Sequence, residues 1–221
     1  ITKKHKLEAG AASLEVTADA DIAQPQLWSP DTPALYTLKV LLKDPKTGEV
    51  YDEVAEHFGL RWFHFDADKG FFLNGERVVF KGVCNHHDLG PLGGIANEAG
   101  IRRQVRILKD MGCNAIRTTH NMPDPNLVRL CDEMGFMMMV EPFDEWDVAK
   151  CENGYHRWFN AESDIKGMTW AERDMLTMLH QWRNNPSVIM WSVGNEVPTQ
   201  KSPDGYKVVH FLQDICHRED P

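Results

Sequence analysis

A carboxylate and an amide stand side by side where an apolar segment of the chain ends. The run Val188–Val193 is apolar and partly β-branched, and it is followed by Gly194, Asn195 and Glu196. Such a run predicts a strand buried on both faces, as in a parallel sheet covered by helices. Catalytic side chains of β/α barrels lie at the carboxyl ends of strands, so Glu196 is the best catalytic candidate. Taken alone, the tripeptide is also typical of an ordinary polar strand exit.

Polar clusters also follow three earlier predicted strands. In chain order they are Asn85–Asp88, Arg117–Asn121 and Glu141–Trp146. If the strands form a barrel, all four clusters lie on one rim and line a site with hydrogen-bond donors and carboxylates. His87 and His120 are candidates for contacting a hydroxylated ligand, whereas His86 is equally a surface or supporting imidazole.

The remaining polar and aromatic residues of these clusters allow more than one function. Arg117 is expected to pair with a carboxylate inside the barrel rather than to clamp a substrate. Glu141 and Glu145 either orient other residues or react. Trp146 is either a core residue or a flat platform for a sugar ring. A three-histidine metal site is disfavoured because the HExxH-type spacing is absent.

Composition excludes several function classes. The chain has 221 residues and a net charge of -9, with no basic stripe, which argues against a nucleic-acid partner. No apolar run approaches the ~20 residues that span a bilayer, so no membrane association is expected. The five cysteines form no CxxC pair, which favours free buried thiols over a disulfide framework or a zinc site. The cellular compartment stays open.

The order of predicted elements divides the chain into two parts. Residues 1–66 read as all-β, with strands at 14–18, 36–42 and 49–58, and they predict part of a β-sandwich. From residue 67 a hairpin around Asn74-Gly75 is followed by strands and helices in alternation. The predicted strands after the hairpin are 78–84, 115–118, 136–140 and 188–193, and the helices are 98–111, 126–134, 170–182 and 205–217.

Strand and helix thus alternate four times, which implies a parallel sheet with right-handed crossovers. Four such units are half of an eightfold barrel. We therefore expect an α/β fold in which residues 67–221 form the first half of a (β/α)8 TIM barrel. The preceding residues 1–66 would be the last strands of the sandwich.

Two long segments resemble the signatures of glycoside hydrolase family 2. Asn114–Pro123, continuing to Leu130–Gly135, resembles one signature, and Arg183–Glu196 resembles the acid/base signature. Phe58–Arg61 and Gly70–Gly75 resemble the family's junction between its immunoglobulin-like domain and its barrel. The resemblance implies a retaining, exo-acting β-galactosidase, β-glucuronidase or β-mannosidase, and a β-galactosidase is the expected member.

The same resemblance implies roles for individual residues. It makes Glu196 the general acid/base and Asn195 the residue that holds the sugar 2-hydroxyl. It aligns His87 and His120 with substrate-binding histidines, and it aligns Arg117 with an arginine in the barrel interior. Trp146 is also expected to bind substrate, on the grounds given above. Apart from the resemblance, Arg117, Glu141 and Glu145 are expected to be supporting residues of the site.

Departures from the family pattern limit these expectations. Some β-galactosidases carry a Glu-x-His magnesium pair where this chain has Glu145-Trp146-Asp147, so we expect no metal and no other cofactor. The resemblance places the nucleophilic glutamate on a later strand, beyond Pro221, so the chain is expected to be a fragment. The expected partners are a carbohydrate substrate and further copies of the chain. The alternative is a non-catalytic carbohydrate-binding or scaffold protein with a barrel-like fold.

Overall fold

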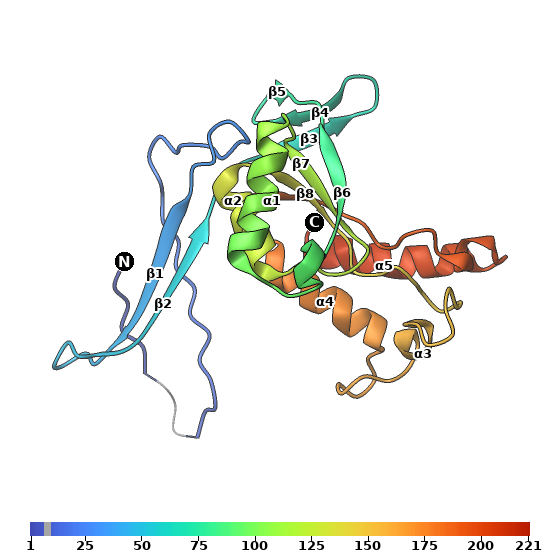
Figure 1. Ribbon diagram of the computed structural model, residues 1–221. Coiled ribbons are helices and arrows are strands. Elements are labelled where there is room, and N and C mark those ends of the chain that lie inside the picture. Colours follow the sequence, from blue (N-terminus) through green and yellow to red (C-terminus); the bar gives the residue numbers. More distant parts are fainter. Residues whose placement is uncertain (7–9) are drawn as a thin grey trace.

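Within the amino-terminal part, residues 36–58 fold into one long antiparallel hairpin. The computed structural model describes residues 1–6 and 10–221, and Figure 1 shows the hairpin projecting from the rest of the chain. Strands β1 (Tyr36–Lys43) and β2 (Val50–Phe58) pair in register from Tyr36 opposite Phe58. At the turn, Asp44 Oδ1 accepts the backbone N–H groups of Lys46 (2.6 Å) and Thr47 (2.8 Å). This side chain thereby stabilises the turn predicted from the sequence.

The predicted strand at residues 14–18 is wrong. These residues are exposed and belong to no strand. Alternation of apolar and polar residues favours an extended chain, but a strand also needs a neighbour that pairs with its backbone donors and acceptors. None of the described strands pairs with this segment.

A small three-stranded sheet connects the hairpin to the α/β part. It consists of β3 (Phe63–Asp66), β4 (Gly70–Leu73) and β5 (Glu76–Arg77), in that order. Asn74 and Gly75 both have positive φ, 53° and 87°, as the predicted Asn-Gly turn requires. The boundary predicted between residues 66 and 67 falls within the β3–β4 hairpin.

Four parallel strands form the central sheet, which confirms the predicted fold class. They are β6 (Gly82–His86), β7 (Ala115–Thr119), β8 (Met137–Val140) and β9 (Val188–Trp191), and they lie in sequence order. Strand β6 begins four residues later than predicted. The Asn114 side chain bonds the preceding residues instead, donating to Val79 O (3.0 Å) and accepting from Lys81 N (2.8 Å). A side chain thus replaces the strand pairing expected there.

The helices follow the predicted pattern closely. They are α1 (Glu98–Asp110), α2 (Pro125–Met134), α3 (His156–Phe159), α4 (Trp170–Trp182) and α5 (Gly205–Glu219), with 3-10 turns at Gly90–Leu92 and Pro198–Lys201. The side chains of Asn97, Asp124 and Thr169 cap the first three long helices by accepting backbone N–H groups. Gly135 ends α2 with a φ of 74°. None of the described helices is long and apolar enough to cross a membrane.

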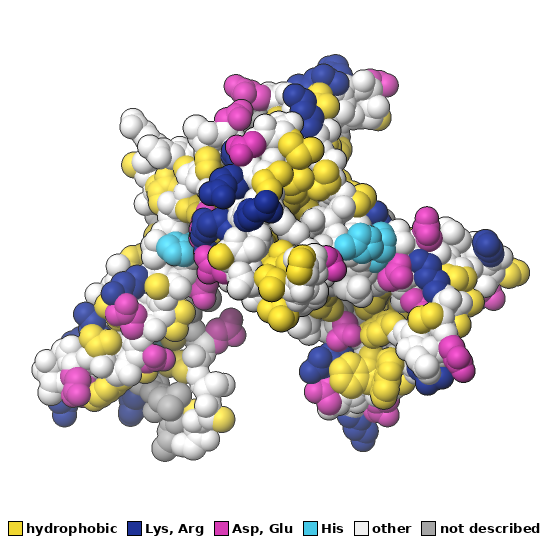
Figure 2. Space-filling model, in the orientation of Figure 1, with side chains coloured by type: hydrophobic (Ala, Val, Ile, Leu, Met, Phe, Trp, Pro, Cys, Tyr) yellow, Lys and Arg dark blue, Asp and Glu magenta, His cyan; other side chains and the backbone are white. Residues whose placement is uncertain are grey.

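The main hydrophobic core lies between the helices and one face of the central sheet. Val105, Leu130, Met175 and Leu212 are buried there on α1, α2, α4 and α5. Cys84, Arg117 and Met139 are in register across β6, β7 and β8 and lie on the opposite face. On the side shown in Figure 2, acidic and basic side chains are interspersed among hydrophobic ones. The helices thus hold the sheet so that the carboxyl ends of its strands meet at one edge.

Candidate active site

A fully buried carboxylate stands where the strands end. Glu141 follows β8 and has no exposed surface. Its Oε2 accepts from Arg117 Nε (3.2 Å) and Nη2 (2.7 Å) on β7, and from the Ser192 hydroxyl after β9. Its Oε1 pairs with His120 Nδ1 at 2.7 Å. Glu141 therefore ties three neighbouring strand exits together through charge-assisted hydrogen bonds.

Asn195 is held at four points. Its Oδ1 accepts from Arg117 Nη2 (3.1 Å) and its Nδ2 donates to Asp144 Oδ1 (3.0 Å). Its backbone N–H donates to Phe143 O (3.1 Å), and its backbone carbonyl accepts from Lys150 Nζ (2.6 Å). Both the side chain and the backbone of Asn195 are thus fixed before any ligand arrives.

Among the acidic residues at the strand exits, Glu196 is the one whose carboxylate accepts no hydrogen bond from a described residue. Its side chain is exposed, and no described residue donates a hydrogen bond to its carboxylate. Its φ of 45° lies in the left-handed region, which non-glycine residues rarely adopt. The chain therefore presents this carboxylate outward, at the carboxyl end of β9, from an unusual backbone conformation.

Trp146 lies beneath the loop that carries Asn195 and Glu196. It is 3% exposed, and its Nε1 donates to Val193 O at 2.7 Å. A Cβ atom on Gly194 would lie 2.6 Å from the same Nε1, so only glycine fits there. Of the two alternatives predicted for Trp146, a core residue or a platform for a sugar ring, the burial of the ring favours the first.

Glu145 organises the segment that follows β8. It is buried and accepts the backbone N–H groups of His156 (2.9 Å), Cys151 (3.2 Å) and Lys150, as well as His156 Nδ1 (3.2 Å). Burial alone would raise the pKa of Glu145, but these hydrogen bonds outweigh it and lower the pKa to about 2. Gly154 packs so closely that an added Cβ would lie 1.8 Å from Glu145 Oε2.

The carboxylates at the position of the family's magnesium pair are used differently here. Both oxygens of Glu145 accept protein donors, and Asp147 Oδ1 accepts from Thr199 Oγ1 at 2.5 Å. Within the described ranges, no group of three or more His, Cys, Asp or Glu side chains is placed to hold a metal ion. These two residues do not fit a magnesium site, and the wider expectation of no cofactor stays a prediction.

Asp144 and Lys150 belong to the site although the sequence did not single them out. Lys150 Nζ pairs with Asp144 Oδ1 at 2.8 Å, next to Asn195. Burial acts to raise the pKa of Asp144, but hydrogen bonds from Lys150 and Asn195 and the charge of Lys150 lower it overall. The cluster Glu141–Trp146 contained Asp144, whereas nothing in the sequence pattern pointed to Lys150.

The histidines lie at the other end of the row of strand exits. His86 and His120 make an edge-to-face contact, with ring centroids 5.1 Å apart. His87 is exposed, and its Nε2 is 2.9 Å from Gly94 O. His86 and His87 help to line a recess of about 300 Å³ between the exits of β6 and β7. His120 therefore belongs to the Glu141 network, whereas His87 borders the adjoining recess.

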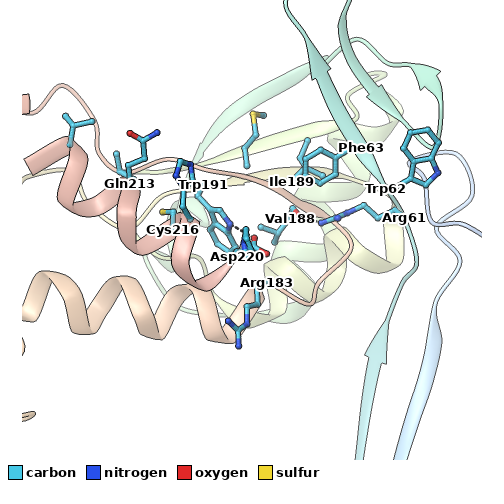
Figure 3. A pocket seen from close by; sticks show the side chains of 15 residues that line it. Arg61, Trp62, Phe63, Arg183, Val188, Ile189, Trp191, Gln213, Cys216 and Asp220 are labelled. Carbon is cyan, nitrogen blue, oxygen red and sulfur yellow. Dashed lines mark hydrogen bonds between the residues drawn. The ribbon is translucent and has the colours of Figure 1, made fainter. Parts of the chain in front are cut away.

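A larger hollow of about 800 Å³ runs along β9 and α5, as Figure 3 shows. Arg61 reaches across it to donate to Pro186 O at 2.9 Å and to Val188 O, and its guanidinium packs over Phe63. Trp191 Nε1 donates to Asp220 Oδ2 at 2.7 Å on the other wall. The Arg61 contacts lie at the start of β9 and the Trp191 contact at its end, and none of them involves a predicted site residue.

Comparisons with known families match this arrangement along almost the whole chain. The family model described as glycosyl hydrolases family 2, TIM barrel domain, matches residues 67–217. A second model, glycosyl hydrolases family 2, matches residues 1–61.

Individual relatives agree with the family match. A beta-galactosidase of Bacteroides ovatus is 47% identical over 186 residues, which cover 84% of this chain and 21% of that protein. A putative beta-glucuronidase of Formosa agariphila is 38% identical over 197 residues, covering 87% of this chain and 18% of that protein. The crystal structure of a beta-glycosidase from Bacteroides vulgatus superposes with a TM-score of 0.81 at 38% identity, covering 90% of this chain and 24% of that one.

The chain thus spans about a fifth to a quarter of the length of these relatives. Both parts of the chain match the same family, in the order seen in the fold. The chain therefore belongs to glycosyl hydrolase family 2.

Proposed function

We propose that this chain supplies the acid/base half of the active site of a retaining exo-β-glycosidase that acts on terminal β-D-galactosides. One observation carries the proposal. Glu196 is an exposed, uncommitted carboxylate on a peptide fixed by its neighbours, at the carboxyl end of a strand of a parallel sheet. That is where β/α barrels hold their catalytic side chains.

In this proposal Glu196 acts twice. As an acid it protonates the glycosidic oxygen while the bond to the anomeric carbon breaks. As a base it then removes a proton from the water that releases the sugar from the enzyme. A carboxyl group held on a fixed peptide performs both transfers from one place, which is the benefit of a preorganised site.

Asn195 is proposed to hold the sugar 2-hydroxyl. A primary amide has two N–H donors, and among the described residues one of them donates, to Asp144. Arg117 occupies one lone pair of the amide oxygen and so sets which way the amide faces. The second N–H remains for a ligand hydroxyl, in a direction already fixed.

The two histidines are proposed to bind other sugar hydroxyls. His120 uses Nδ1 on Glu141, which leaves Nε2 for a ligand. His87 lies on the rim of the neighbouring recess. Arg117, Glu141, Glu145 and Trp146 hold the site from beneath rather than touch the sugar.

The nucleophile is proposed to lie outside residues 1–221. Retention needs a second carboxylate about 5–5.5 Å from the acid/base. Glu141, Asp144 and Glu145 are each committed to hydrogen bonds within the protein, so none of them is free to attack. We expect residues 1–221 alone to hydrolyse no aryl glycoside and to self-associate through the open edges of the sheet. A chromogenic galactoside assay with light scattering on this segment tests both expectations, and an active monomer would contradict them.

Substrate class is tested on the full-length protein with 4-nitrophenyl glycosides. The 47% identical relative bears the name beta-galactosidase, whereas others bear the name beta-glucuronidase. We expect kcat/KM for the β-galactoside to exceed that for the β-glucuronide and the β-mannoside by at least about tenfold, since matched polar contacts discriminate strongly. A preference for the glucuronide would reject the galactoside assignment but keep the acid/base proposal. Sugar binding without hydrolysis would favour the non-catalytic alternative.

A further inference from the structure

We propose that Lys150 is a positioning residue for Glu196. Its ammonium group fixes the peptide that joins Asn195 to Glu196 and thereby aims the carboxylate. The inference rests on the proposed function, because it assigns a role in the acid/base step.

The ammonium group closes a ring of hydrogen bonds at this peptide. Lys150 Nζ donates to Asn195 O at 2.6 Å and to Asp144 Oδ1 at 2.8 Å. The same Asp144 oxygen accepts from Asn195 Nδ2 at 3.0 Å. Lys150 therefore links the carbonyl and, through Asp144, the side chain of Asn195. The two ends of that residue cannot move independently.

The orientation of this carbonyl determines where Glu196 points. A peptide group is planar, so fixing the carbonyl oxygen of Asn195 also fixes the direction of the Glu196 N–H. The direction of the Glu196 side chain then depends on its φ, which is 45°. This left-handed conformation is disfavoured for a residue with a Cβ and persists only where neighbours hold it. Without the Lys150 contact, rotation of the peptide would relax the conformation and turn the carboxylate away.

Lys150 is itself anchored, so it can serve as a fixed point. Its backbone N–H donates to Glu145, and the same carboxylate binds the amides of Cys151 and His156. The Lys150 side chain is 22% exposed, less than half of the 46% for Asp144. An ordinary surface ion pair adds little because both partners are mobile and screened by solvent. This one differs because its lysine also bonds a backbone carbonyl next to the acid/base.

The experiment measures kcat and KM of the full-length protein with two aryl β-galactosides. The 2,4-dinitrophenyl group leaves without protonation, whereas the phenyl group needs it. We expect Lys150→Met to lower kcat/KM for the phenyl galactoside by ~10–100-fold and for the dinitrophenyl galactoside by less than about threefold. The loss should lie in kcat rather than in KM. Lys150→Arg should recover most of it, because a guanidinium can reach both acceptors.

Lys207 offers a matched control. It is an exposed lysine on α5 that pairs with Asp204, so Lys207→Met removes the same charge and should change neither substrate's kcat/KM. If Lys150→Met does not fold, as judged by thermal unfolding and circular dichroism, Lys150→Gln is measured instead and judged by the same results.

Two results would overturn the inference. If Lys150→Met lowered kcat/KM equally for the two galactosides, Lys150 would only support the loop. If kcat/KM for the phenyl galactoside were unchanged, Glu196 would be positioned without Lys150. Either result, in an active protein, would leave the proposed function intact. If the unmutated full-length protein hydrolyses no β-glycoside, the proposed function fails and the inference fails with it.

Discussion

Arg117 Nη2 donates a hydrogen bond to Asn195 Oδ1 at 3.1 Å, although 78 residues separate the two in sequence. The same nitrogen lies 2.7 Å from Glu141 Oε2, a fully buried carboxylate. A buried charge therefore sets the direction of the amide that precedes Glu196. The ligand-facing N–H of Asn195 is oriented by residues that do not themselves need to touch a sugar.

Asn195→Ala should lower kcat more than it raises KM. A hydrogen bond to the 2-hydroxyl strengthens as the transition state forms, so its loss removes transition-state stabilisation above all. Steady-state kinetics of the full-length protein with a galactoside and its 2-deoxy analogue measure this. The mutation should lower kcat much less for the 2-deoxy analogue than for the galactoside. An equal fall in kcat would show that the amide does not contact that hydroxyl.

Glu141→Gln should destabilise the fold by ~3–5 kcal/mol, because it leaves the Arg117 charge without its buried partner. Denaturant unfolding measures the change. Glu133→Gln is the control: Glu133 pairs with Arg102 and Arg129 but is 34% exposed, so its loss should cost at most ~1 kcal/mol. If both variants lowered the free energy of unfolding by a similar small amount, the structural role assigned to Glu141 would be contradicted.

Stability should depend on the ionisation of Glu145. Its pKa in the folded chain is about 2, below the ordinary value of 4.5, so folding favours the charged form. This contribution is fully present above pH 4.5 and is lost as the pH falls toward 2. Unfolding free energies of the full-length protein and of Glu145→Gln should therefore converge across that range. A difference between them that stays constant from pH 6 to pH 3 would contradict the assignment.

Gly194→Ala should impair catalysis, because the new Cβ would meet Trp146 Nε1 at 2.6 Å. The rigid indole cannot yield without disturbing the loop that carries Asn195 and Glu196. Gly112→Ala is the control for destabilisation without a clash, since Gly112 has a φ of 87°, which Gly194 does not share, and open space around it. Strain at positive φ should destabilise this variant, but its kcat should be unchanged; equal losses of kcat in both variants would contradict the packing argument.

Local sequence patterns predicted the central sheet and its helices well. Helix α4 begins at Trp170 and ends at Trp182, as its apolar spacing predicts, because caps and periodicity are local signals. The start of β6 was missed because the Asn114 side chain, 33 residues away from Lys81, replaces strand pairing there. A contact between two segments far apart in the chain produces no periodic pattern of apolar residues in either segment.

The candidate site divides in the same way. The common location of Glu196, Asn195, Arg117 and Glu141 could be predicted, because Arg117 lies on a strand and the other three follow strands of the same parallel sheet. Lys150 could not, because it lies in an irregular segment whose course depends on buried hydrogen bonds to Glu145. Whether Trp146 is exposed or buried depends on its packing against Gly194, which composition cannot reveal.

The acid/base assignment of Glu196 is tested most directly by Glu196→Gln in the full-length protein, with phenyl and 2,4-dinitrophenyl β-galactosides and with added azide. We predict that kcat/KM for the phenyl galactoside falls by ~10²–10⁴-fold, because its leaving group needs a proton. The dinitrophenyl galactoside should lose far less in kcat/KM, and azide should raise its kcat, since a small anion needs no general base. Equal losses for both galactosides that azide does not relieve would contradict the account.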